Sequence, residues 1–127
     1  NFLFELIIFQ MYGNFTGNTF EKITGTAMNF VNSEYPVYIH GNTFRENTMT
    51  SSDLISITLS MTNPQAFYFE SNTFVNNTVR DLFTSSVSST SSIRNLQFVR
   101  NTFIDNTCTS GRTLPVNERF FLNYNMY

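Results

Sequence analysis

The sequence predicts an all-β fold: one parallel β-helix, a solenoid of about five stacked coils of 24–30 residues that covers residues 1–127. Three observations predict it. A short Asn-Thr-Phe motif returns at nearly regular intervals, the residues before each copy alternate with the period of a strand, and a second β-rich run follows each copy. No segment has the length and capping residues of a long helix.

The repeat unit is Asn-Thr-Phe-x-x-Asn-Thr, in which the first copy has Ile23 in place of the second Asn and the closing copy has Tyr127 in place of the Phe. The steps between copies are 24, 30, 29 and 24 residues, a period typical of solenoids, propellers or arrays. The first Asn of the unit falls at five positions: Asn18, Asn42, Asn72, Asn101 and Asn125.

Two to three short strands are predicted in each unit. Before the motif, Val37 and Ile39 share one parity and Tyr38 and His40 the other, which is strand alternation rather than helical spacing. The second β-rich runs after the motif cover residues 27–31, 54–59, 81–83 and, weakly, 114–116. The opening apolar run, residues 2–9, lacks the basic start of a signal peptide and is too short to span a bilayer, so we expect a buried strand there.

Identical positions in successive coils should stack at about the strand spacing of 4.8 Å. Two interior columns follow, in which aromatic rings lie in offset contact. One column is Phe15, Ile39, Phe69, Phe98 and Leu122. The core stack of the motif itself is Phe20, Phe44, Phe74, Phe103 and Tyr127.

Asparagine suits the corners between strands, because it tolerates a left-handed backbone and its amide can bond to the next Asn in the stack. Asn47, Asn77 and Asn106 are therefore predicted to form a structural ladder. Differences in coil length should fall in loops on one side, at Thr62–Gln65 and Ser85–Ser92.

The Asn-Thr-Phe-x-x-Asn-Thr unit resembles the repeats of right-handed parallel β-helix proteins of the pectin-lyase-like class. Its shorter Phe-x-x-Asn pattern is similar to the repeats of bacterial polymorphic outer-membrane and autotransporter passenger domains, and of large surface proteins of protists. The resemblance covers about residues 12–127. It implies a right-handed solenoid, but it is weaker for function, because enzymes, adhesins and filaments share this coil.

Composition excludes several classes of function. Charged residues make up 13% of the chain and the net charge is −2, so no basic patch favours nucleic acid as a partner. Cys108 is the only cysteine, which rules out a disulfide within the chain and a cysteine-based zinc site. An aromatic share of 17% argues against disorder.

No catalytic, cofactor-binding or metal-binding residue is predicted. Glu46 and Asp105 share a repeat position, but they lie two units apart with Asn76 between them, so a solvated corner is favoured over a glycosidase pair. His40 is a lone outward histidine without a second ligand.

A threonine column could instead organise water on a flat face, as ice-binding solenoids do. Each coil offers a single Thr there rather than a Thr-x-Thr pair, which favours ordinary polar turn chemistry. The column comprises Thr19, Thr43, Thr73 and Thr102.

Outward aromatic residues at Tyr38, Tyr68 and Phe121 form a candidate strip that would stack on carbohydrate or, slightly favoured, pack against another subunit. Candidate glycosylation sequons, relevant only in a secreted protein, begin at Asn14, Asn76 and, in a rarer form ending in cysteine, Asn106.

The sequence favours a non-catalytic structural or adhesive β-solenoid segment of a cell-surface or extracellular protein, with a filament subunit as one form of it. The alternative is a carbohydrate-active lyase or hydrolase of the same fold, with its active site outside this segment. Both termini fall inside the repeat pattern, without the polar caps of a free solenoid, so we expect the partner to be more of the same chain or neighbouring subunits.

Overall fold

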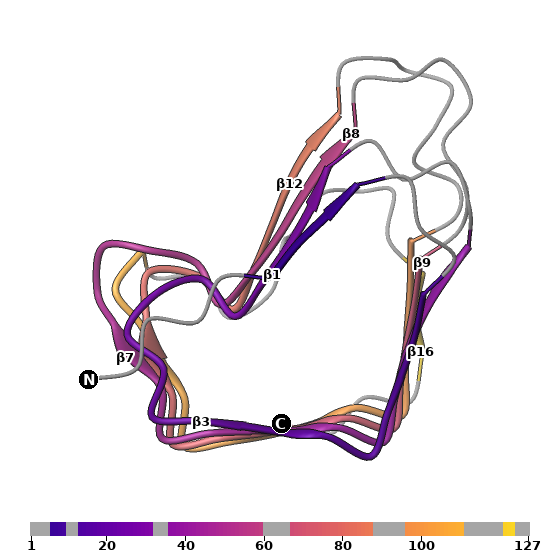
Figure 1. The fold of residues 1–127 in the computed structure, drawn as a ribbon. Coiled ribbons are helices and arrows are strands. Elements are labelled where there is room, and N and C mark those ends of the chain that lie inside the picture. Colours follow the sequence, from indigo (N-terminus) through magenta and orange to yellow (C-terminus); the bar gives the residue numbers. More distant parts are fainter. Residues whose placement is uncertain are drawn as a thin grey trace.

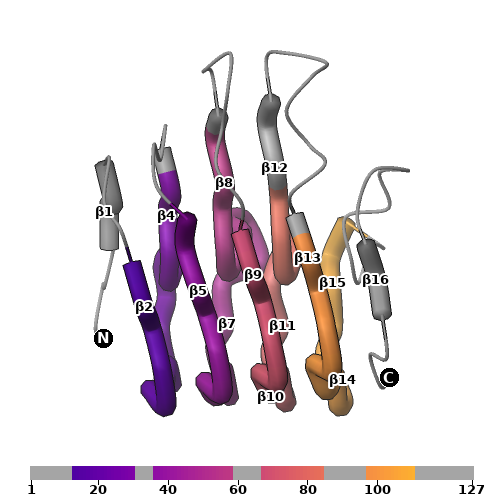
Figure 2. Tube along the Cα trace, turned by 90° about the vertical axis from the view of Figure 1, so that its right-hand side faces the viewer, coloured from indigo at the N-terminus to yellow at the C-terminus, as the bar shows by residue number. Residues whose placement is uncertain are grey.

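The computed structural model forms a right-handed parallel β-solenoid. Seen down its axis, the chain turns clockwise as it recedes from the N-terminal side, and the coils superimpose (Figure 1); from the side they lie next to one another in sequence order (Figure 2). The residues whose structure is described are 6–9, 13–31, 36–59, 67–87, 96–110 and 121–123. No helix occurs within these ranges.

Four parallel sheets form the walls of the solenoid, and each is named here by its first strand. The β2 sheet comprises β2 (Gly13–Thr16), β5 (Val37–His40), β9 (Phe67–Glu70), β13 (Leu96–Val99) and β16 (Phe121–Asn123). The β3 sheet comprises β3 (Thr19–Glu21), β6 (Thr43–Arg45), β10 (Thr73–Val75) and β14 (Thr102–Ile104). The β7 sheet comprises β7 (Thr48–Met49), β11 (Thr78–Val79) and β15 (Thr107–Cys108). The β1 sheet comprises β1 (Leu6–Phe9), β4 (Met28–Val31), β8 (Ile55–Leu59) and β12 (Phe83–Val87).

The prediction of two to three strands per coil is wrong for the coils that contribute to all four sheets. The coil from β5 to β8, for example, has four strands. The additional strand is the two-residue segment that follows the second Asn of the motif, where Thr48 and Met49 pair with Thr78 and Val79 of the next coil. Such a short pairing depends on register with its neighbours rather than on strand propensity.

The register of the sheets matches the repeat. Phe44 pairs with Phe74 and Phe74 with Phe103, while Phe20 pairs with Phe44, so the motif positions lie directly beside one another. The Phe15, Ile39, Phe69, Phe98 and Leu122 column is likewise in register. Tyr127 and Asn125 lie outside the described residues.

The second β-rich runs are strands as predicted in β4 and β8, and β1 lies within the opening apolar run. The run predicted at 81–83 is shifted, because β12 begins only at Phe83 and then includes Ser85, Ser86 and Val87, which were predicted to lie in a loop. They pair with Ile57, Thr58 and Leu59 of β8, and this register carries the strand past the point where serine-rich sequence predicted a loop. The predicted loop at 62–65 and the weak strand at 114–116 lie outside the described residues.

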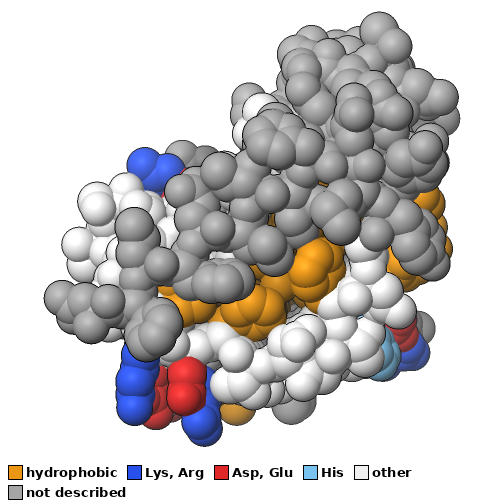
Figure 3. All heavy atoms as spheres, viewed as in Figure 1, with side chains coloured by type: hydrophobic (Ala, Val, Ile, Leu, Met, Phe, Trp, Pro, Cys, Tyr) orange, Lys and Arg blue, Asp and Glu red, His pale blue; other side chains and the backbone are white. Residues whose placement is uncertain are grey.

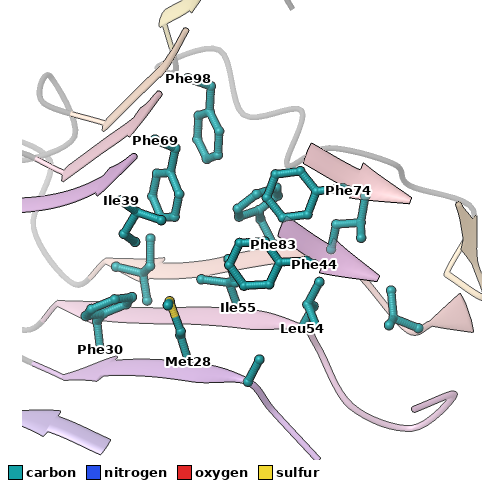
Figure 4. Packing of buried hydrophobic residues seen from close by; sticks show 14 of the residues in the cluster. Met28, Phe30, Ile39, Phe44, Leu54, Ile55, Phe69, Phe74, Phe83 and Phe98 are labelled. Carbon is teal, nitrogen blue, oxygen red and sulfur yellow. The ribbon is translucent and has the colours of Figure 1, made fainter. Parts of the chain in front are cut away.

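Stacked phenylalanines fill the interior (Figure 4). Phe44, Phe74 and Phe103 stack with ring centroids 4.8 and 5.0 Å apart, and Phe69 stacks on Phe98 at 4.8 Å. Phe83, from the opposite wall, meets Phe74 edge-on at 5.1 Å. The strand spacing thus sets the spacing between rings, and the edge contacts join the two columns into one core.

The corners correct one expectation about asparagine. The ladder asparagines are not the left-handed residues; the residue immediately before each of them is. Before the first Asn these are Gly17, Gly41, Ser71 and Arg100, and before the second Asn position they are Lys22, Glu46, Asn76 and Asp105, with φ between +50° and +67°. A left-handed residue at this place turns the following side chain inward, where its amide can bond to the next coil.

Candidate functional site

The predicted asparagine ladder is present at the corner between the β3 and β7 sheets. Asn47 Nδ2 donates to Asn77 Oδ1 at 2.8 Å, and Asn77 Nδ2 donates to Asn106 Oδ1 at 2.8 Å. Each Oδ1 also accepts the backbone N–H of the residue before it in the stack, at 3.2 Å from Asn47 and 3.1 Å from Asn77. Ile23, which replaces Asn in the first coil, still donates its backbone N–H to Asn47 Oδ1 at 2.9 Å.

A second ladder, which the sequence analysis did not predict, occupies the corner between the β2 and β3 sheets. The amides of Asn18, Asn42, Asn72 and Asn101 are joined by Nδ2-to-Oδ1 bonds of 3.2, 3.1 and 3.0 Å. Asn42, Asn72 and Asn101 are almost fully buried. The signal that could have found this ladder is the presence of Asn at this position in every copy of the repeat.

Both ladders are also tied to the wall strands. Asn77 Nδ2 donates to Phe44 O at 2.9 Å, and Asn72 Nδ2 donates to Ile39 O at 2.8 Å. An inner asparagine of a ladder therefore uses its full donor capacity. Among the described residues, no buried side-chain nitrogen or oxygen lacks a hydrogen-bond partner.

The outward face of the β2 sheet carries part of the predicted aromatic strip. Tyr38 and Tyr68 stack with ring centroids 4.7 Å apart and an interplanar angle of 5°. Gln97 comes next in register and Phe121 follows it, so an amide interrupts the predicted Tyr38–Tyr68–Phe121 strip. A half-open depression of about 230 Å³ lies where Gln97 interrupts the aromatic column, lined by Tyr68, Phe69, Glu70, Gln97 and Val99.

Charged side chains gather at the two lower corners in Figure 3, where they pair across coils. At one corner, Arg45 contacts Glu21, with its Nε 2.6 Å from Oε2. At the other corner, Arg100 forms an ion pair with Glu70, and His40 Nδ1 lies 3.8 Å from Glu70 Oε2. All five side chains are at least one-third exposed, so these pairs contribute little to stability.

A buried carboxylate joins two coils near the β1 sheet. Asp53 is 6% exposed, and its two oxygens accept from Arg80 Nε at 2.8 Å and Arg80 Nη2 at 2.5 Å. Thr84 Oγ1 donates to Asp53 Oδ2 at 2.8 Å. The hydrogen bonds that Arg80 donates to Asp53 raise the pKa of Arg80 above its ordinary value. This cluster braces neighbouring coils, and it was not found from the sequence because its members fall outside the repeat motif.

The remaining candidate residues lie apart from one another. Glu46 and Asp105 are exposed corner residues in coils that are separated by the coil of Asn76, as expected. Cys108 is half-buried against the core, and this burial raises the pKa of its thiol. Within the described part of the chain, no three His, Cys, Asp or Glu side chains come together in a way that could hold a metal ion.

The threonine column lies on the outward face of the β3 sheet, where its members pair in register across successive coils. Two positions further along each strand, the outward side chain is Glu21, Arg45, Val75 or Ile104. No strand of this sheet therefore presents a Thr-x-Thr pair.

The three sequons occupy different environments. Asn14 and Asn76 are exposed, whereas Asn106 is half-buried within the ladder. In the ranges that the structure describes, no helix is long and apolar enough to span a membrane. Comparisons with protein-family models, with curated proteins and with solved structures found no match to this chain.

Proposed function

We propose that this chain is a structural segment of a β-solenoid exposed on a cell surface or outside the cell, where it serves as a rigid spacer or adhesive stalk. The observation that carries the proposal is that the repeated residues form hydrogen bonds or ring stacks with their equivalents in the neighbouring coils. The Asn of each motif extends a ladder and the Phe extends a stack. Residues repeated for this purpose give length and stiffness, because every added coil reproduces the same interface.

The outward side chains support a role in contact rather than in chemistry. The β2 sheet presents the stacked Tyr38 and Tyr68 rings beside the depression at Gln97. An aromatic surface with adjacent polar groups suits weak binding to carbohydrate or packing against a neighbouring subunit. Two exposed carboxylates, Glu21 and Glu70, pair with arginines of adjacent coils.

The test compares, in the protein's native cells, variants in which an inward-facing or an outward-facing side chain is replaced. Surface biotinylation and antibody labelling of intact cells report exposure, and release of reducing or unsaturated sugars from a panel of acidic and neutral polysaccharides reports catalysis. The proposal predicts a surface-exposed protein that releases no sugar. It predicts that Asn77→Ala abolishes surface display, whereas Glu70→Gln and the pair Glu46→Gln and Asp105→Asn leave display unchanged.

A protein found only inside the cell would overturn the proposal. So would sugar release that disappears in one of the outward carboxylate variants while the fold is retained. The second result would favour a carbohydrate-active lyase or hydrolase.

A further inference from the structure

We propose that the solenoid carries N-linked glycans at two sites, Asn14 and Asn76, and that the ladder excludes a glycan from the third sequon, Asn106, in the folded and secreted protein. The inference rests on the extracellular setting proposed above, since glycan transfer to Asn-x-Thr takes place in the secretory pathway. In this reaction, Asn Nδ2 forms a bond to C1 of an oligosaccharide carried on a polyprenyl diphosphate. The bond from C1 to the diphosphate oxygen breaks, the lipid diphosphate leaves, and Nδ2 loses one proton to a base of the transferase.

Asn76 lies at an exposed corner between β10 and β11. Its φ is +53°, and its backbone N–H donates to Ile104 O at 3.0 Å, so the backbone is held while the side chain points away from the core. The equivalent residues in the neighbouring coils, Glu46 and Asp105, are also exposed. A glycan on Asn76 would therefore leave the molecule from a ridge of outward side chains.

Asn14 occupies the outward face of the β2 sheet, in register with Tyr38. It is exposed, and its Oδ1 accepts a hydrogen bond of 2.7 Å from the hydroxyl of Thr16, the third residue of its own sequon. This bond uses the carbonyl oxygen of the amide and orients Nδ2 away from Thr16. The folded strand thus leaves the amide nitrogen, which is the atom that carries the glycan, accessible enough to accommodate a glycan added before folding.

Asn106 has the opposite arrangement. Its Nδ2 donates to Phe74 O at 2.8 Å, and its Oδ1 accepts both the backbone N–H and Nδ2 of Asn77. A sugar on this nitrogen would have to fit into the corner where the ladder runs. Because glycans are added to the chain before it folds, a chain modified at Asn106 would lose ladder bonds and should fail to leave the secretory pathway.

The experiment expresses the full chain behind a secretion leader in cells that carry out N-glycosylation and maps the secreted protein by mass spectrometry with and without glycan removal. Two occupied sites are expected, at Asn14 and Asn76. Thr16→Val should remove only the first and Thr78→Val only the second, because valine keeps the β-branched shape of threonine but lacks its hydroxyl. The double variant should carry none.

Cys108→Ser is the matched control for the third site, since it converts the rare sequon into an ordinary Asn-Thr-Ser sequon. Asn106 should remain unmodified in the secreted form of this variant. Any modification there should be confined to retained protein. Secreted protein that is bare at Asn14 or Asn76, or that is modified at Asn106, would overturn the inference.

Native material separates this inference from the proposed function. If the native protein is intracellular and bare while the leader-bearing chain gains both glycans, the extracellular role fails and the site assignment stands. If the native protein is at the surface but Asn14 and Asn76 are bare, the assignment fails and the extracellular role stands.

Discussion

Phe74→Ala perturbs the centre of the interior stack. The ring is fully buried and contacts three others: Phe44 at 4.8 Å, Phe103 at 5.0 Å and Phe83 edge-on at 5.1 Å. Three ring pairs at 0.5–1.5 kcal/mol each contribute about 1.5–4.5 kcal/mol beyond the burial of apolar area. We therefore expect a loss of about 5 kcal/mol, the upper end of the range for Phe→Ala in a core.

Phe20→Ala is the matched comparison, because Phe20 occupies the same column but is half-buried and stacks on Phe44 at 4.8 Å. Its loss should cost about 2 kcal/mol, an ordinary value for a single substitution. Urea denaturation followed by far-UV circular dichroism measures both, and unchanged m-values would show that the midpoints compare the same transition. Equal losses from the two variants would refute the argument that the inner rings carry the core.

The ladder, the Asp53 brace and the thiol give further predictions. Asn77→Ala should lower the free energy of unfolding by about 3 kcal/mol or more, because it leaves several buried groups without partners. Asn76→Gly should be neutral or stabilising, because glycine relieves the left-handed strain at φ +53°. Equal losses of unfolding free energy for the two variants, measured by urea denaturation, would contradict the ladder. Arg80→Ala should destabilise the protein more than Asp53→Asn does. The first variant leaves a buried carboxylate without its cation, whereas the second leaves a half-exposed guanidinium that water can solvate. Calorimetry that finds the lower melting temperature in Asp53→Asn would contradict this prediction. Because burial raises the pKa of Cys108, less thiolate is present at neutral pH. Alkylation of Cys108 should therefore be slower than that of a small free thiol and should accelerate only at a higher pH. An alkylation rate and pH profile equal to those of the small thiol would show that Cys108 is not buried as described.

The interior could be predicted from the sequence because the period fixes the register. Once Phe44, Phe74 and Phe103 occupy the same place in each copy, stacking follows from the strand spacing, and the Asn47–Asn77–Asn106 ladder follows from the same alignment. The interruption of the aromatic column was also visible in the sequence, where Gln97 aligns with Tyr68.

Other features depend on context that the repeat does not show. The left-handed corners include Glu46 and Arg100, whose side chains have no preference for positive φ, so the turn is imposed by the ladder asparagine that follows each of them. Ser85 and Ser86 have little strand propensity and continue β12 because β8 beside them provides hydrogen-bonding partners. Asp53 and Arg80 are 27 residues apart and belong to no copy of the motif, so nothing in the sequence pattern pairs them.

The central claim is that each coil lies in register on the next, and the distance between equivalent positions tests it most directly. Thr48 and Thr107 are exposed, occupy equivalent strands β7 and β15, and are separated by β11. Spin labels on cysteines at these two positions, in a Cys108→Ser background, should show strong dipolar broadening from backbones roughly 10 Å apart, two strand spacings. Singly labelled chains, which should show none, control for contacts between molecules. A doubly labelled chain with a spectrum equal to the sum of the two single spectra would place these positions far apart and contradict the stacked solenoid.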